Sequence, residues 1–180
     1  YINQAMTISF LAYKLPYILY EIWNHLRKSE SGDECIHFCL SGDRSGDEAK
    51  HLVSGKPIVL DYSALLTLSL LRLLPRLLDG LKTVYIEQRT VDDMDRDFVE
   101  HKDGLLKAIH DFLHSANPGI RKVSYDLDPG ERGSILEKGL GRTAVAALFL
   151  AQKQGLPFYS DDSGTRDLAN QRHVDTVSTR

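Results

Sequence analysis

Hydrophobic positions in the second part of the chain form two alternating patterns. Short apolar runs, typical of strands buried in a parallel sheet, are separated by longer stretches in which apolar residues recur at helical spacing. The predicted strands are 56–61, 83–86, 123–127, 156–160 and 174–178. The predicted helices are 64–73, 75–80, 90–98, 104–114, 143–154 and 163–170. Strands that alternate with helices predict an α/β fold, with a parallel central sheet of four to five strands in a three-layer α/β/α arrangement.

The N-terminal part of the chain has a different composition and hydrophobic pattern. Apolar residues near the N-terminus fall on one face of a helix that is predicted to begin near Pro16. The stretch 29–56 is richer in Ser, Gly, Asp and Glu, which are typical of turns, and a short strand is expected at 35–40. We therefore expect a helical N-terminal flank and linker in residues 1–54, followed by the α/β domain in residues 55–180.

Composition and charge limit the class of protein. The chain is 42% hydrophobic and 26% charged, which is typical of a globular protein with a sizeable core. Its net charge of -3 gives no bulk attraction to nucleic acid, so such contact would depend on a local basic patch or a metal. No apolar run reaches the roughly 18 to 20 residues of a bilayer span, and no secretory signal is found. Two cysteines do not make a disulfide framework, so we expect a cytoplasmic protein that does not contact a membrane.

Aspartates follow several of the predicted strands. Asp61 ends the first strand, and Asp161 and Asp162 follow a later one. Asp92 and Asp93 lie in the first turn of the helix predicted after the second strand. Ligand sites of open parallel sheets lie beyond the carboxyl ends of the strands, so these acids should converge if the strands are neighbours. Crowded carboxylates raise one another's pKa, and a hard cation such as Mg²⁺ or Mn²⁺ relieves the repulsion. Such a cation polarises a phosphoryl oxygen and generates hydroxide from bound water, which favours metal-assisted hydrolysis of phosphodiesters.

Simpler interpretations stand beside this one. An aspartate after a strand is often a turn or N-cap residue, and Asp161-Asp162-Ser163 before a helix is typical of a cap. Only the placement of these acids together at one edge of the sheet favours a metal-binding or catalytic role. His110 and His114 share a helix face but lack the His-Glu-x-x-His pattern of zinc proteases, and we interpret them as part of a solvated or partner-facing helix. The single stretch Cys35-x-His37-x-Cys39 lacks the second ligand pair of a structural zinc site.

Three stretches together resemble a known family. Residues 58–66 (IVLDYSALL) form a strand whose closing aspartate is followed by Ser and Ala. Residues 84–94 (VYIEQRTVDDM) join a second strand to a helix that carries acids. Residues 147–169 contain an alanine-rich helix, a strand, a Ser/Thr-x-Asp signature and a further helix, and 173–178 fits a closing strand. In this order the features resemble the PIN domains, a family of metal-dependent nucleases, over roughly residues 55–180.

The resemblance implies a PIN-type endonuclease, in particular an endoribonuclease, that uses Mg²⁺ or Mn²⁺ to cut RNA or single-stranded DNA. It implies that Asp61, Asp93 and Asp162 are catalytic acids and metal ligands, and that Asp161 supports the metal. The spacing matches Asp93 to the family's second acid better than Asp92. The residues expected to contact the substrate are Arg142, Thr143 and Ser160.

One position departs from the family pattern. Family members usually carry a third acid at the start of the alanine-rich helix, where 141–146 reads GRTAVA. Glu137 or Asp128 could supply a carboxylate from the preceding loop, or Thr143 could help to hold a metal-bound water. The alternative is a PIN-like domain that has lost catalysis and serves as a protein-interaction module. PIN-like domains also end large bacterial multidomain proteins, which fits a chain that begins at Tyr1 rather than Met, and many pair as homodimers.

Overall fold

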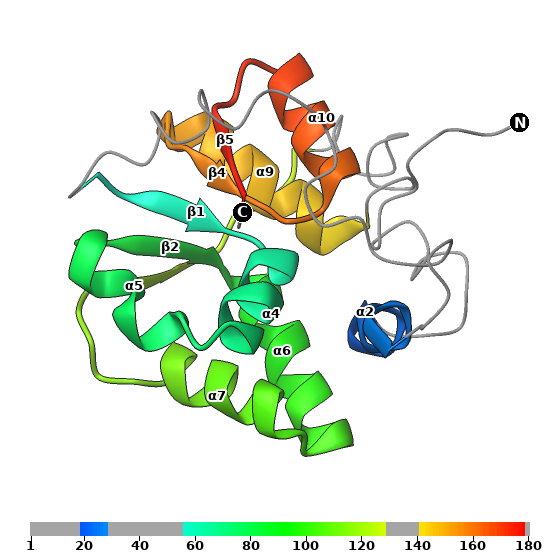
Figure 1. Cartoon of the computed structure of the whole chain (residues 1–180). Coiled ribbons are helices and arrows are strands. Elements are labelled where there is room, and N and C mark those ends of the chain that lie inside the picture. The colour runs from blue at the N-terminus through cyan, green and yellow to red at the C-terminus, as the bar shows by residue number, and fades with distance from the viewer. Residues whose placement is uncertain (1–18, 29–55, 129–140, 179–180) are drawn as a thin grey trace, which may run out of the picture.

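The computed structural model describes residues 19–28, 56–128 and 141–178. A sheet of five parallel strands, in the order β3-β2-β1-β4-β5, lies between the helices (Figure 1). The strands are β1 (Ile58–Leu60), β2 (Val84–Glu87), β3 (Ile120–Val123), β4 (Phe158–Tyr159) and β5 (Thr176–Val177). The described helices are α2 (Leu19–Lys28), α4 (Tyr62–Leu70), α5 (Leu74–Gly80), α6 (Gln88–His101), α7 (Gly104–Leu113), α9 (Arg142–Gln154) and α10 (Ser163–Gln171). The strand expected at 35–40 and the start of the helix near Pro16 fall outside the described residues.

Each face of the sheet has its own hydrophobic core, which confirms the three-layer α/β/α fold. Alternate residues of β1 point to opposite faces. Ile58 and Leu60 pack in the cluster that includes apolar residues of α4, α5, α6 and α7. Val59 packs in the second cluster, with residues of α9 and α10. Figure 1 shows α4, α5 and α7 on one side of the sheet and α9 and α10 on the other. Burial on both faces explains why the strand reads as an unbroken apolar run.

The strand order brings the predicted acids to one edge of the sheet. Strand β1 is central and pairs in parallel with β2 on one side and β4 on the other. Since parallel strands end at the same edge, Asp61 after β1 and the Ser160–Asp162 loop after β4 lie beside each other. Glu87, the last residue of β2, occupies the neighbouring place on the other side.

The predicted position of the third strand is wrong. A strand was expected at 123–127 because apolar residues alternate there, but β3 covers Ile120–Val123. The exposed Arg121 and Lys122 lie within this edge strand and weaken its apolar signal. Tyr125 and Leu127 are buried against α9, but in an extended segment that follows the strand. The alternating pattern at 123–127 therefore indicates which side chains are buried, but it does not indicate which residues form the hydrogen bonds of the sheet.

Two helix starts also differ from the prediction. Helix α6 begins at Gln88 rather than at residue 90, and the side chain of Glu87 caps it. Asp92 and Asp93 therefore lie in the second turn of α6, not in the first. Helix α4 begins directly after Asp61, which is its N-cap residue. Both shifts occur because an acid that closes a strand also caps the helix that follows.

Helix α2, the described part of the N-terminal flank, packs on the α/β domain. Tyr20, Ile22 and Trp23 are buried in the same cluster as Ile58 of β1. The ring of Tyr20 lies 5.1 Å from that of His101 at the end of α6. Within the described parts of the chain, no helix combines the length and the apolar character that a membrane crossing requires.

Candidate functional site

The hydroxyl of Ser63 joins the ends of β1 and β4. It donates a hydrogen bond to Oδ1 of Asp61 at 2.9 Å. It accepts hydrogen bonds from the backbone N–H of Asp161 at 2.9 Å and of Asp162 at 3.1 Å. The hydroxyl of Ser160 lies 3.3 Å away. One side chain in the first turn of α4 therefore links the carboxylate of Asp61 to the backbone of Asp161 and Asp162 at the same edge of the sheet.

Asp61 and Asp162 are both N-cap residues, as the simpler interpretation predicted for Asp162. Oδ1 of Asp61 accepts a hydrogen bond from the N–H of Ala64 at 2.8 Å. Oδ1 of Asp162 accepts one from the N–H of Thr165 at 3.0 Å. Because a carboxylate has two oxygens and several lone pairs, a cap bond to one oxygen is compatible with a metal contact through the other. Capping and metal binding are therefore not exclusive at these positions.

Three acids at this edge of the sheet are buried, and burial disfavours the ionised form of Asp61. The exposed fractions of Asp61, Asp161 and Asp162 are 3%, 2% and 6%. Burial raises the pKa of Asp61 to about 7, although hydrogen bonds from three neighbours lower it, and the charge of Asp162 raises it further. A cation placed between such carboxylates would offset both the lost hydration and the repulsion.

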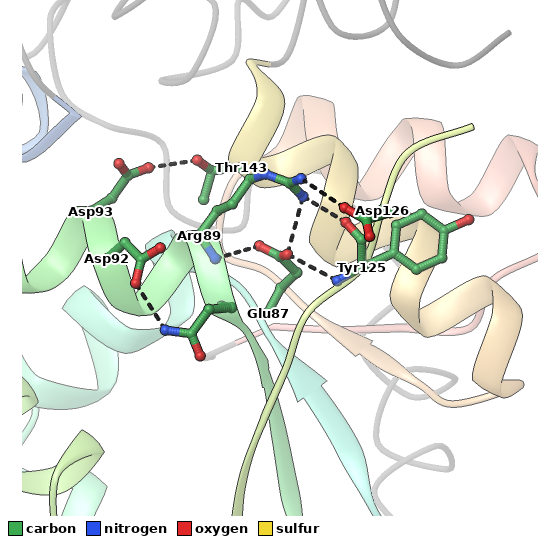
Figure 2. Close-up of polar contacts among 8 residues, drawn as sticks. Glu87, Arg89, Asp92, Asp93, Tyr125, Asp126 and Thr143 are labelled. Carbon is green, nitrogen blue, oxygen red and sulfur yellow. Dashed lines mark hydrogen bonds and ion pairs between the residues drawn. The ribbon is translucent and has the colours of Figure 1, made fainter. Parts of the chain in front are cut away.

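Asp93 belongs to a different contact, which joins α6 to α9. Its Oδ2 accepts a hydrogen bond from the hydroxyl of Thr143 at 2.5 Å (Figure 2). Its Oδ1 forms an ion pair with Nη1 of Arg96 at 2.9 Å. Asp92 is exposed, and its carboxylate instead accepts a hydrogen bond from Gln88 at 2.8 Å. Of the two neighbouring acids, only Asp93 reaches the position where the family's third acid is missing.

A further carboxylate, which the sequence analysis did not identify, links the two groups. Asp97 is fully buried one turn after Asp93. It accepts a hydrogen bond from the hydroxyl of Tyr62, and Nη2 of Arg96 lies 3.4 Å from its other oxygen. Burial raises the pKa of Asp97, while the bond from Tyr62 and the charge of Arg96 lower it. Since Tyr62 follows Asp61 in the chain, this bond ties α6 to the start of α4.

Glu87 at the end of β2 has a structural role. It is 1% exposed, and burial raises its pKa. Its Oε2 accepts a hydrogen bond from the N–H of Arg89 at 2.7 Å, and its Oε1 meets Nη1 of Arg89 at 3.1 Å and the N–H of Tyr125 at 3.2 Å (Figure 2). Nη1 of Arg89 also donates to the carbonyl of Tyr125 at 2.6 Å. The carboxylate of Glu87 thus links the segment after β3, through Tyr125, to the start of α6, through Arg89.

The three residues expected to contact a substrate lie in different environments. Arg142, the first residue of α9, is exposed. Thr143 is half-buried and engaged with Asp93. Ser160 is fully buried; its carbonyl accepts a hydrogen bond from Arg166 at 2.8 Å, so it shapes the loop that carries Asp162. Of the two carboxylates considered as replacements for the missing acid, Asp128 ends a described segment and residue 137 is outside the described ranges.

Comparison with known proteins identifies the family. Residues 59–171 match a family model described as the PIN domain associated with the TPR-GreAB-C-PIN system. Because this match spans more than half of the chain, the chain belongs to that family, which confirms the resemblance drawn from the sequence. PIN domains are generally nuclease-like and generally bind divalent metals, and the family description places this one in a larger multidomain context.

Among solved structures, the chain is similar to a PilT N-terminus domain protein from the hyperthermophilic archaeon Sulfolobus solfataricus P2. The two share 12% identity with a TM-score of 0.45, and the match covers 68% of this chain and 87% of that chain. A search of curated proteins found no match.

Proposed function

We propose that this PIN domain is an endonuclease that hydrolyses phosphodiester bonds of RNA or single-stranded DNA with the help of Mg²⁺ or Mn²⁺. The observation that supports it most is the Ser63 contact, which joins the carboxylate of Asp61 to the backbone of Asp161 and Asp162 at the carboxyl edge of adjacent strands. Ligand-binding sites of open parallel sheets occur at this edge. Residues 55–180 would form the catalytic domain, and residues 1–54 a flank.

The donor set fits a hard divalent cation. Asp61, Asp161, Asp162 and Asp93 offer only carboxylate oxygens, which Mg²⁺ and Mn²⁺ prefer over softer ligands. When bound, such a cation supplies Lewis-acid polarisation of a phosphoryl oxygen and favours ionisation of water. Burial of Asp61, Asp161 and Asp162 excludes bulk water from their inner side and strengthens their interaction with any charge placed there.

Side chains at the start of α9 would orient the substrate. Arg142 is exposed beside Thr143, and a guanidinium at this place would contact a substrate phosphate through charge-assisted hydrogen bonds. Thr143 holds Asp93 in one orientation through the 2.5 Å hydrogen bond. Ser160 acts indirectly, because its hydroxyl lies 3.2 Å from the N–H of Asp162 and accepts its hydrogen bond.

A second candidate is a PIN fold without catalysis that acts as a protein-interaction module. The contacts of Asp93 favour it: one carboxylate oxygen is bound by Thr143 and the other is paired with Arg96. An acid that is already neutralised by a guanidinium attracts a cation less. The family description supports neighbouring domains in the same system, and we propose those domains, or a second copy of the chain, as protein partners in the cytoplasm.

A nuclease assay with matched variants separates the two candidates. The chain is incubated with labelled RNA and single-stranded DNA in Mn²⁺, alongside Asp61→Asn and Asp93→Asn. The control is Asp92→Asn, because Asp92 is the exposed neighbour of Asp93. The nuclease proposal predicts cleavage that both site variants reduce by about 100-fold or more and that the control leaves unchanged. No cleavage by the unmodified chain, or equal cleavage by all four proteins, would contradict it.

A further inference from the structure

A second group of metal-ligating side chains lies between α6 and α7, outside the acidic site. Asp95 belongs to α6, His110 belongs to α7, and His114 is the C-cap residue that follows α7. Nε2 of His114 is 2.9 Å from both carboxylate oxygens of Asp95, and Nε2 of His110 is 3.9 Å from Oδ1. One ligand atom from each of the three residues can be chosen so that all lie within 4.8 Å of one another.

The backbone fixes this arrangement. Residues four apart in a helix lie on the same face, and His114, at the C-cap of α7, continues the face of His110, so both imidazoles point toward α6. Their ring centroids are 4.5 Å apart with the planes inclined at 33°. Phe98, one turn after Asp95, packs against the ring of His110 with centroids 4.8 Å apart. The three side chains are therefore positioned by α6, by α7 and by the residue that caps the end of α7.

We propose that Asp95, His110 and His114 bind Zn²⁺ or a similar late first-row divalent cation. In a tetrahedral zinc site with bonds of about 2.0–2.1 Å, neighbouring ligand atoms are about 3.3 Å apart. The distances of 2.9 and 3.9 Å to Asp95 bracket that value, so small side-chain rotations would complete the three-ligand set. The side chains are one-third to two-fifths exposed, which leaves a fourth position open to water.

The chemistry of this site differs from that of the acidic site. Two imidazole nitrogens and one carboxylate suit zinc, whereas carboxylate-only sites suit Mg²⁺ and Mn²⁺. Asp93 and Asp95 are two positions apart on α6 and contact different parts of the chain: Asp93 contacts Thr143 of α9, and Asp95 contacts the two histidines in and at the end of α7. A cation at this second site would therefore not share ligands with the first.

One neighbour must move for the metal to bind. Nζ of Lys122 lies 3.3 Å from Nδ1 of His114, and in this contact Lys122 donates and Nδ1 accepts. A neutral imidazole then keeps its proton on Nε2, facing Asp95. Ligation through Nε2 moves that proton to Nδ1, so the exposed Lys122 has to turn into solvent. On the other imidazole, Nδ1 of His110 is buried without a hydrogen-bond partner among the described residues, and Oδ1 of Asp111 lies 3.8 Å from it.

The test is a titration of the metal-free chain with Co²⁺ alone, followed by visible absorption, because four-coordinate Co²⁺ with imidazole ligands absorbs far more strongly than six-coordinate Co²⁺. We expect one equivalent to give this spectrum and Zn²⁺ to displace it. His110→Ala and His114→Ala should each weaken binding by about tenfold or more, since each removes one of three ligands. If either alanine variant fails to fold, Asp95→Asn, which keeps the side-chain shape, provides the same test.

Three controls locate the bound cation. Asp61→Asn should leave the Co²⁺ spectrum intact, since it changes only the acidic site. The double variant Cys35→Ser, Cys39→Ser should also leave it intact, as should His101→Gln, a histidine of α6 outside the cluster. Absence of a four-coordinate spectrum at micromolar Co²⁺, or a spectrum that survives the His110 and His114 substitutions, would overturn the proposal.

Discussion

Replacing Asp61 by asparagine should stabilise the metal-free chain at alkaline pH. The perturbation is small in shape, because an asparagine oxygen can still accept the hydrogen bonds from Ala64 and Ser63. It removes a charge from a position that is 3% exposed. The folded-state pKa of Asp61 is about 7, against 3.8 for an unburied aspartate. Ionisation of this one side chain therefore costs the folded state free energy that the variant does not lose.

The size and direction of the effect follow from that pKa. Because the folded-state pKa is raised, the folded chain binds the proton more tightly than the unfolded chain does. The contribution to stability is fully present below about pH 4 and is lost as the pH rises through 7. At about 1.4 kcal/mol for each pKa unit, the loss approaches 4 kcal/mol above pH 8, as an upper bound before the folded state relaxes. Asp61→Asn should match the unmodified chain near pH 4 and exceed it by a few kcal/mol at pH 8.

Urea unfolding in a chelator at pH 4, 6 and 8 measures this difference. The difference between the two proteins isolates Asp61, because the other buried acids, Glu87 and Asp97, titrate in both. Asp92→Asn is the matched control: it removes an exposed carboxylate and should leave the pH profile unchanged. A difference that stays constant from pH 4 to pH 8 would refute the reasoning, since it would show that Asp61 ionises in the folded chain as easily as in the unfolded one.

Three further predictions concern the supporting contacts. Tyr62→Phe removes a hydrogen-bond donor from the buried carboxylate of Asp97 and should lower the free energy of unfolding, measured in urea, by about 1–3 kcal/mol. An unchanged free energy of unfolding would show that this hydrogen bond does not stabilise the fold. Ser63→Ala should weaken Mn²⁺ binding in calorimetry, because it releases the contact between the β1 and β4 ends, and equal affinity would contradict that role. Thr143→Asp restores an acid beside Asp93 and should raise Mn²⁺ affinity, whereas Thr143→Val should not; identical affinities would exclude this position from the site.

The sequence predicted the layers of the fold because its strands are buried on both faces. Runs such as that around Ile58 contain no polar residue until the closing aspartate, and that signal is independent of tertiary contacts. The edge strand β3 was misplaced, since Arg121 and Lys122 face solvent and leave only a weak pattern. The start of α6 was also placed late, because the cap by Glu87 depends on the geometry of its side chain.

The candidate site was predicted in part for a similar reason. Aspartates at strand ends are visible in a sequence, so Asp61 and Asp162 were identifiable from position alone. The roles of Ser63 and Asp97 were not, because both depend on contacts between segments far apart in the chain. A weak signal existed for Asp97, which lies four residues after Asp93 and therefore on the same face of α6. The spacing alone does not indicate a role for Asp97; its hydrogen bond from Tyr62 in the structure does.

The most direct test of the central claim is the binding of Mn²⁺ to the chain, measured by calorimetry. The unmodified chain should give a saturable heat signal for one or more bound Mn²⁺ ions, and Asp61→Asn should lose that signal while Asp92→Asn keeps it. This result would show that a hard cation depends on the acids at the ends of β1 and β4. Absence of binding at millimolar Mn²⁺, or binding that is the same in Asp61→Asn, would contradict the metal site and with it the nuclease proposal.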